Sequence, residues 1–317
     1  MEFFGRSLIV ALLLASTAST AQDYPTRPVR VVVPFPAGID APARIAAEKL
    51  SQALGGSWLV DNKSGAGGSI ASAAVASAAP DGYTLLVNSS ALTMYPAVYS
   101  NLTFDPAKDL IPIATICEVP LVMVVSADKN WRSVKDLIAY ARSKPGVLTY
   151  GTAGSASTTH LAFERLRSEA KFDGVHVPFK GSNLAVAEIL AGRVDVGYTT
   201  IAGAQAGIQS KRLIALAMSG KRRSSLLPEV PTIIEAGFAN SDFTVWMGLF
   251  APAKTPQPIV DRLSQELLKA LAIPANREQI IRAGLEPLSV PMEQFQAMFQ
   301  SEFPINQALA KAAGLKP

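Results

Sequence analysis

Short apolar runs alternate with stretches of helical periodicity in the first part of the chain. Runs of about 4–8 apolar residues that end at a turn are typical of buried strands, and apolar side chains three or four positions apart are typical of helices. By these criteria the order is strand, helix, strand, helix, strand, over residues 29–33, 41–54, 58–60, 69–79 and 84–87. This order predicts a parallel sheet with helices on its faces.

The same alternation restarts in the middle of the chain, with a strongly apolar strand at 121–125. The strands and helices expected after it lie at residues 133–143, 147–150, 157–170, 174–178, 184–191, 194–198 and 213–218. The pattern therefore predicts a second α/β unit behind the first.

A strand at 245–250 is followed by a mostly helical tail. Its helices are expected at 258–270, 277–283 and 292–313, and its only strand candidate is 286–289. A helical tail without its own sheet must bury its apolar face on an existing unit, and we assign it to the first.

The expected fold is α/β, with mixed, mainly parallel sheets flanked by helices. The tail divides the mature chain into lobe 1, residues 22–120 plus 245–317, and lobe 2, residues 121–244. Two crossings between the lobes, near Pro120 and Thr244, predict a hinge and a cleft that closes on a ligand.

The composition excludes several classes of protein. The 317 residues are 49% hydrophobic and 17% charged, with a net charge of +4, whereas an average soluble domain has roughly 25% charged residues. A large buried core is therefore expected rather than a disordered chain. The excess of basic residues is small and scattered, which argues against nucleic acid as a partner.

The chain has one cysteine, Cys117, and two histidines, His160 and His176. These numbers exclude a disulfide framework and a Cys/His-rich zinc site. The motifs of helical metalloproteases and of EF-hand calcium loops are also absent. We therefore expect neither a metal site nor a cofactor.

Residues 1–21 are typical of a secretory signal peptide. Arg6 supplies the basic n-region, residues 7–15 form an apolar h-region, and Ser19 and Ala21 precede a cleavage site before Gln22. The apolar segment is too short for a membrane span of about 20 residues. The sequence therefore predicts export and removal of this segment.

Two loops that follow predicted strands carry candidate ligand-binding residues, because ligands of open α/β sheets bind beyond the carboxyl ends of the strands. The first loop, residues 34–40, supplies Phe35, Ala37, Gly38 and Asp40. Asp40 is also well placed to cap the helix that follows.

The second loop, residues 151–160, is rich in glycine, serine and threonine at the start of a helix. Free N–H groups and the helix dipole bind anions there without a cationic side chain. The alternative is that the hydroxyl groups only cap the helix, but the loop has more of them than capping needs. Its candidates are Thr152, Gly154, Ser155, Ala156, Ser157, Thr158 and Thr159.

Further candidates lie at the ends of other strands and at the second crossing: Ser89, Ser90, Lys180, Thr199, Thr200 and Trp246. Lys180 is expected to face either an anion or solvent, and Trp246 either to contact the ligand or to pack in the hinge. Residues 64–69 look like a phosphate-binding loop but lack the lysine of a Walker motif. Their expected role is close packing of a helix on a strand.

A secreted hydrolase is the alternative function, with Ser155 or Ser157 as nucleophile and His160 as base. The GxSxG motif is absent, and His160 is poorly placed as a base for a serine of its own loop. We therefore expect no catalytic residue and no enzyme. A third interpretation is an interaction scaffold that binds no ligand.

Seven ordered motifs cover essentially all of the mature chain. They lie at residues 24–36 (YPTRPVRVVVPFP), 61–68 (DNKSGAGG), 79–86 (APDGYTLL), 103–109 (TFDPAKD), 176–181 (HVPFKG), 226–232 (LLPEVPT) and 248–252 (GLFAP). In this combination the chain resembles the tripartite tricarboxylate transporter substrate-binding family, also called TctC or Bug (Bordetella uptake gene) receptors.

The resemblance implies a periplasmic receptor, a monomer with the type II "Venus flytrap" fold, that binds a small organic acid and delivers it to membrane permease subunits. In this family the ligand carboxylate is typically held by main-chain groups, loop hydroxyls and bridging waters. Such water bridges are enthalpically close to direct hydrogen bonds. The resemblance thus assigns ligand contacts to the same two loops.

The first loop departs from the family pattern. The family usually has Pro-Phe-Pro-Pro-Gly-Gly-x-x-Asp, whereas this chain has PFPAGID at residues 34–40, two residues shorter and with one glycine. Ile39 adds apolar surface there. We therefore hypothesise a mono- or dicarboxylate with an apolar or aromatic body, or at least a ligand other than the common short dicarboxylates.

Overall fold

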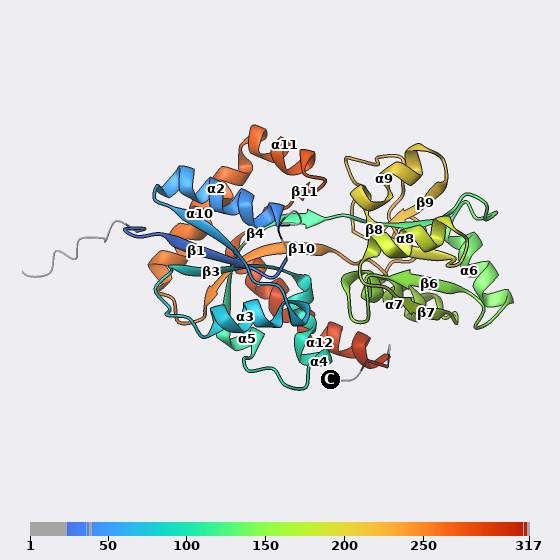
Figure 1. Ribbon diagram of the computed structural model, residues 1–317, viewed down its shortest axis with the longest axis horizontal. Coiled ribbons are helices and arrows are strands. Elements are labelled where there is room, and N and C mark those ends of the chain that lie inside the picture. The colour runs from blue at the N-terminus through green and yellow to red at the C-terminus, as the bar shows by residue number, and fades with distance from the viewer. Residues whose placement is uncertain (1–23, 36, 38–39, 313, 316–317) are drawn as a thin grey trace, which may run out of the picture.

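Two mixed sheets form the frame of the computed structural model, which describes residues 24–315 apart from 36, 38–39 and 313. The sheets lie side by side, each covered by helices (Figure 1). We call the body built on the first sheet lobe 1 and that built on the second lobe 2. The predicted signal peptide and Gly38 lie outside the described residues.

The six-stranded first sheet combines strands from both ends of the chain. In spatial order these are β11 (Glu286–Pro287), β4 (Leu110–Val119), β10 (Val245–Pro252), β3 (Thr84–Ser89), β1 (Val29–Val33) and β2 (Trp58–Asn62). Strand β1 pairs in parallel with β2 and β3, as the alternating pattern predicts, and the other pairs are antiparallel.

The five-stranded second sheet comes from the middle of the chain. Its order is β7 (Val175–Pro178), β6 (Thr149–Thr152), β8 (Val196–Thr200), β5 (Leu121–Ser126) and β9 (Leu213–Met218). Strand β6 is parallel to β7 and β8, whereas β5 is antiparallel to β8 and β9. Both sheets are mixed as expected, but parallel pairs do not predominate, because the strands next to the crossings run against their neighbours.

Four clusters of buried apolar side chains correspond to the two faces of each sheet. In lobe 1, α2 (Ala41–Leu54), α10 (Gln257–Ala272) and α11 (Pro274–Arg282) contribute to one face, and α3 (Ser69–Ala76) and α12 (Met292–Ala312) to the other. In lobe 2, α6 (Val134–Ser143) and α7 (Thr158–Ala170) contribute to one face, and α8 (Ser182–Leu190) and α9 (Ile201–Gln209) to the other.

Short helical segments complete the path: η1 (Ala66–Gly68), η2 (Ser90–Met94), α4 (Tyr95–Val98) and α5 (Pro106–Asp109). The glycines of η1 lie close to other side chains. A Cβ at Gly67 would lie 2.0 Å from the Tyr99 hydroxyl oxygen, and one at Gly68 would lie 2.9 Å from Pro34 Cβ. No helix among the described residues has the length and apolar character needed to cross a membrane.

Strand β4 was not predicted from the pattern, although most of its residues are buried. Its sequence contains Pro112, and proline within an apolar run argues against a strand because it cannot donate to the ladder. The pairing accommodates it with an irregularity: Leu249 pairs with Ala114 but Phe250 with Pro112, so that Ile113 is the extra residue of a bulge.

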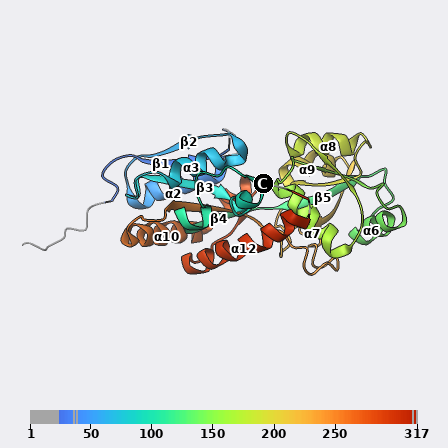
Figure 2. The same ribbon diagram turned by 90° about the horizontal axis from the view of Figure 1, so that it is seen from below.

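Helix α12 links the two lobes. Its first half packs Phe295 and Phe299 in lobe 1, while Leu309 and Ala310 belong to the buried cluster of β5, α6 and α7 in lobe 2. Figure 2 shows the helix running from beneath lobe 1 to α7. Pro304 lies inside it, where the missing N–H group favours a bend. The C-terminal helix thus contributes to both cores.

We expect Leu309→Ala to lower the free energy of unfolding by about 2 kcal/mol or more, because it removes a buried side chain where α12 meets lobe 2. Ile305→Ala is the matched control in the same helix. Its side chain is 48% exposed, so the change should stay within about 0.5 kcal/mol. Urea unfolding of both variants provides the comparison, and equal losses would contradict this role of Leu309.

Candidate functional site

The strands that carry candidate residues end beside the hinge. Ser89 at the end of β3 pairs with Met247 near the start of β10, and Thr200 at the end of β8 pairs with Leu121 at the start of β5. Strands β10 and β5 begin where the chain crosses between the lobes. Strand β1 is parallel to β3, and β6 is parallel to both β7 and β8. The loops that follow these strands therefore lie at the end of each sheet that is nearest the other lobe.

The first loop is anchored at both ends by one side chain of β2. The Asn62 amide donates hydrogen bonds from Nδ2 to the Phe35 carbonyl oxygen (2.8 Å) and to Asp40 Oδ2 (2.9 Å). Phe35 is half-buried and Ala37 exposed. Asn62 was not singled out from the sequence, although it lies in one of the family motifs.

Asp40 is buried, but its side chain does not cap α2 as expected. Instead its carboxylate accepts from Asn62 and pairs with Arg44 Nη2 at 2.8 Å, while its backbone carbonyl accepts from Ala43 and Arg44. The carboxylate therefore serves to fix the loop.

Most N–H groups of the second loop are already bonded within the protein. The N–H of Ala153 donates to Thr159 Oγ1 (2.9 Å), and the N–H of Gly154 donates to Thr152 Oγ1 (3.2 Å). The N–H of Ala156 donates to His160 Nδ1 (3.1 Å), and the N–H of Ser157 donates to the Gly154 carbonyl (3.2 Å). Within the described part of the chain this leaves the N–H groups of Ser155, Thr158 and Thr159 without an acceptor.

Three of the five hydroxyl groups of this loop also have structural roles. Ser157 caps α7 by accepting from the His160 N–H (3.3 Å) and donates to the Gly154 carbonyl (2.7 Å). Thr152 and Thr159 accept the amides named above. Ser155 is exposed and Thr158 half-buried, and neither hydroxyl forms a hydrogen bond with a described residue. The surplus of hydroxyls over capping thus reflects a network that shapes the loop.

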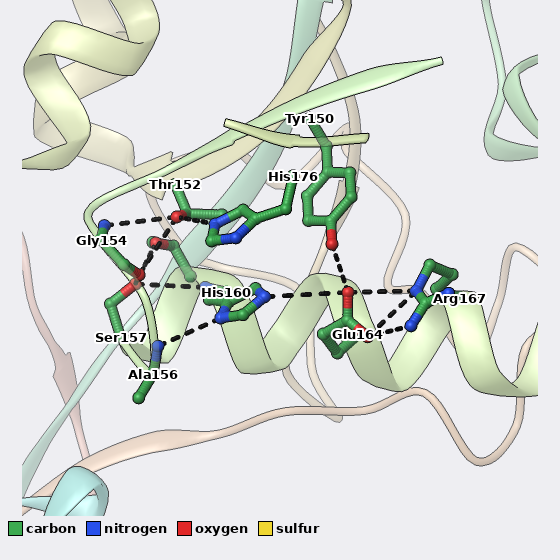
Figure 3. Close-up of polar contacts among 10 residues, drawn as sticks. Tyr150, Thr152, Gly154, Ala156, Ser157, His160, Glu164, Arg167 and His176 are labelled. Carbon is green, nitrogen blue, oxygen red and sulfur yellow. Dashed lines mark hydrogen bonds and ion pairs between the residues drawn. The ribbon is translucent and has the colours of Figure 1, made fainter. Parts of the chain in front are cut away.

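Behind the loop lies a stack of aromatic rings (Figure 3). The sequence suggested His160 only as the base of a hydrolase and did not predict this stack. The imidazoles of His160 and His176 stack at 3.8 Å between centroids and 5° between planes, and Tyr150 lies against His176 at 5.2 Å. His176 Nε2 bonds Thr152 Oγ1 at 2.7 Å. Glu164 links the stack to Arg167: its carboxylate accepts a hydrogen bond from the Tyr150 hydroxyl and pairs with Arg167 Nη2 at 2.6 Å.

Both imidazoles are held neutral by their surroundings. Burial, together with the neighbouring His176, lowers the pKa of His160 to about 4, although Glu164 acts in the opposite direction. Burial likewise lowers the pKa of His176. The loop is therefore supported by uncharged rings at neutral pH.

The end of β8 offers a buried hydroxyl that has no partner among the described residues, that of Thr199. Beside it, Thr200 caps α9 by accepting from the Gly203 N–H (3.1 Å). A Cβ at Gly203 would lie 2.7 Å from Thr199 Oγ1 and 3.1 Å from Asn183 Oδ1, so polar oxygens converge there. Lys180 lies just before α8, the helix that contains Asn183, and is exposed.

Ser90 and Trp246 belong to a cavity of about 320 Å³ at the hinge, between α12 and lobe 2. Ser89 caps η2 through its bond from the Ala91 N–H. The Ser90 hydroxyl is buried and has no partner in the described part of the chain. Trp246 is fully buried and donates from Nε1 to Glu302 Oε1 (2.7 Å), so the packing interpretation accounts for its position.

The arrangement does not favour hydrolysis. His160 Nδ1 accepts from a backbone amide, and its Nε2 faces Glu164 Oε1 at 3.8 Å. The Ser157 hydroxyl donates to a carbonyl. A serine nucleophile needs a base within about 2.6–3.2 Å, and this geometry gives it none. Among the described residues no group of three His, Cys, Asp or Glu side chains is placed to hold a metal ion.

Comparison with known proteins identifies close similarities over most of the chain. The profile of the "Tripartite tricarboxylate transporter family receptor" matches residues 42–315. The UPF0065 protein in the tcbD-tcbE intergenic region of Pseudomonas sp. (strain P51) is 37% identical over 92% of this chain and 89% of its own length.

Two solved structures are also similar. R. palustris Rpa4515 with adipate has a TM-score of 0.79 and 31% identity, over 93% of this chain and 99% of that chain. The periplasmic binding protein BugD has a TM-score of 0.75 and 32% identity, over 92% of this chain and 99% of that chain.

We expect Ser157→Ala to lower the free energy of unfolding by about 1 kcal/mol, because it removes the cap of α7. Thr158→Val should change it by less than about 0.5 kcal/mol, since that hydroxyl has no bonded partner among the described residues. Thermal or urea unfolding of the ligand-free variants measures the difference. A loss at Thr158 equal to that at Ser157 would contradict the distinct roles assigned here.

Glu302 should make stability depend on pH. Burial raises its pKa to about 7, against the hydrogen bonds from Trp246 and Thr93 and the charge of Arg165. The folded chain therefore holds a proton that the unfolded chain releases, so this contribution is present below the ordinary pKa of about 4.3 and is lost as pH rises through about 7.

Glu302→Gln keeps an acceptor for Trp246 but cannot ionise. We expect its stability relative to the natural chain to improve as pH rises from about 4.3 to about 7. Urea unfolding across this range measures the difference, with Glu293→Gln, an exposed residue of the same helix, as control. A pH-independent difference for Glu302→Gln would contradict the assignment.

Proposed function

The chain belongs to the tripartite tricarboxylate transporter receptor family, and we propose that it is an extracytoplasmic receptor for a small organic carboxylate. It binds this ligand between its lobes and delivers it to a transporter of the tripartite tricarboxylate type. The observation that carries the proposal is the set of donors at the second loop and beside it: the N–H groups of Ser155, Thr158 and Thr159 and the hydroxyl of Thr199.

The strand pairing supports placing these donors close together. Strands β6 and β8 are neighbours, with Gly151 opposite Gly197, and Ala153 and Thr199 each follow two residues later. Adjacent strands are about 4.8 Å apart, so we infer that Thr199 lies near the start of the second loop. A buried hydroxyl without a partner costs free energy, and a ligand oxygen would satisfy it.

Such a site can bind a carboxylate with micromolar affinity without an arginine side chain. A hydrogen bond to a charged group contributes about 1.5–3 kcal/mol, and the positive end of the α7 dipole adds to it. Three or four bonds supply the roughly 8 kcal/mol of micromolar binding. Lys180, exposed before α8, would face a second carboxylate, and the first loop, with Phe35, Ala37 and Asp40, would close over the ligand.

For the ligand we propose a mono- or dicarboxylate with an apolar body. Support comes from the shortened first loop and from the similar R. palustris protein, whose structure contains adipate. The sequence feature behind this proposal is the apolar Ile39, which lies outside the described residues.

The remaining proposals concern the whole chain. Residues 1–21 would direct export to the periplasm, where the similar BugD is a binding protein. The mature monomer would move as two bodies, 22–120 with 245–317 and 121–244, about the crossings near Pro120 and Thr244. Neither a cofactor nor nucleic acid takes part, and the partners are the organic acid and the membrane permease.

A panel of aliphatic and aromatic mono- and dicarboxylates that includes adipate tests the proposal by thermal shift and calorimetry. Thr199→Val should weaken binding about tenfold and leave the melting temperature of the free protein unchanged or raised, because the buried hydroxyl is lost. Thr103→Val, at an exposed position, is the control and should bind normally.

Failure of every carboxylate to shift the melting temperature would overturn the receptor assignment. Stabilisation by small polar amino acids alone would overturn the apolar-body proposal. Unchanged affinity in Thr199→Val would remove β8 from the site.

A further inference from the structure

We propose that His160 and His176 are positioning residues for the ligand, each acting through one particular ring nitrogen on the backbone of the second loop. The inference rests on the proposed function of that loop and adds to it the groups that hold its shape. Neither imidazole needs to touch the ligand. The two act together because they stack in one column behind the loop (Figure 3).

His160 fixes the sharpest point of the loop. Its Nδ1 accepts from the Ala156 N–H at 3.1 Å, and Ala156 has φ of 60°. Residues other than glycine rarely adopt this left-handed backbone conformation unless the surrounding structure holds them in it. The bond requires an unprotonated Nδ1, so the proton lies on Nε2, which faces Glu164 Oε1 at 3.8 Å.

His176 fixes the start of the loop through Thr152. The Thr152 hydroxyl donates to the Gly154 carbonyl (3.1 Å) and accepts from the Gly154 N–H (3.2 Å). His176 Nε2 lies 2.7 Å from the same hydroxyl, and the tautomer of the imidazole decides which of the two groups donates. The imidazole thus completes the hydrogen bonding of the residue from which the loop departs.

The consequence for the ligand is direct. By using the N–H groups of Ala153, Gly154, Ala156 and Ser157 internally, the network turns the loop so that the N–H groups of Ser155, Thr158 and Thr159 stay free within the described part of the chain. Loss of the His160 bond would release Ala156 from its left-handed conformation and disturb Ser155 beside it. Affinity would then fall although no ligand contact had been removed.

The column also sets the pH range in which the loop is formed. The titratable groups facing the two imidazoles are Tyr150 from β6 and Glu164 and Arg167 from α7. A protonated His160 cannot accept from Ala156 and would carry its charge against the neighbouring ring. Because the pKa of His160 is lowered to about 4, its bond to the Ala156 N–H should persist from neutral pH downward and be lost as pH approaches about 4.

Four substitutions test the proposal, because the amide of Asn lies near the Nδ1 position of His and the amide of Gln near the Nε2 position. His160→Asn and His176→Gln should keep the bonds to Ala156 and Thr152, whereas His160→Leu and His176→Leu remove them. The first readout is amide hydrogen exchange of residues 153–159 in the free protein. Exchange at Ala156 should accelerate about tenfold or more in His160→Leu and little in His160→Asn.

The second readout is the dissociation constant for adipate. We expect it to rise about tenfold in the Leu variants and to stay within about threefold in His160→Asn and His176→Gln. Nitrogen-15 chemical shifts of the imidazoles provide a third readout, with Nδ1 of His160 unprotonated.

Equal effects of Leu and Asn at position 160, or a proton on His160 Nδ1, would overturn the proposal. Unchanged exchange at Ala156 in His160→Leu would also overturn it while leaving the proposed function intact. Absence of carboxylate binding by the natural chain would overturn the proposed function, and these ligand-free measurements would distinguish that result.

Discussion

The pairing of β10 between β3 and β4 is the constraint on which the rest of the structure depends. All eight residues of β10 are buried, and its antiparallel register places Met247 opposite Ser89. This pairing returns the chain to lobe 1 after lobe 2 is complete and places the end of β3 beside the hinge. Helix α12 can then bridge both cores, because β10 has already joined this part of the chain to the first sheet.

A second constraint is the need to satisfy the backbone of the second loop. Buried N–H groups without partners are costly, and a loop that binds an anion must still leave some of them available. Here the hydroxyls of Thr152, Ser157 and Thr159 and one imidazole each accept a hydrogen bond from a backbone N–H group of the loop or of the start of α7. The low fraction of charged residues fits this arrangement, since anion recognition would be left to a few backbone donors.

Burial also changes the pKa values of two polar side chains, in opposite directions for an acid and a base. Glu302 is largely surrounded by α12, Trp246 and Thr93, and burial raises its pKa to about 7. His160 is buried as well, but its ring is a base, so burial lowers its pKa to about 4. In both cases burial favours the neutral form, so polar side chains pack in α12 and behind the loop with less buried charge.

The sequence by itself determined the local elements and the places where a ligand is expected. Apolar periodicity located most strands and helices, capping of a helix by a hydroxyl of the second loop was expected, and the ordered motifs pointed to the receptor family. Local patterns failed where the decisive partner is distant in sequence. Pro112 obscured β4, whose bulge exists only against Leu249 and Phe250.

Three hydrogen bonds join residues that only tertiary folding brings together. They link Asn62 with Asp40, His176 with Thr152, and Trp246 with Glu302. Tertiary structure therefore decided which hydroxyls and amides of the loop are used internally and which remain available. The physical reason is that hydrogen-bond satisfaction is settled by all neighbours in space, whereas the sequence pattern reports only those along the chain.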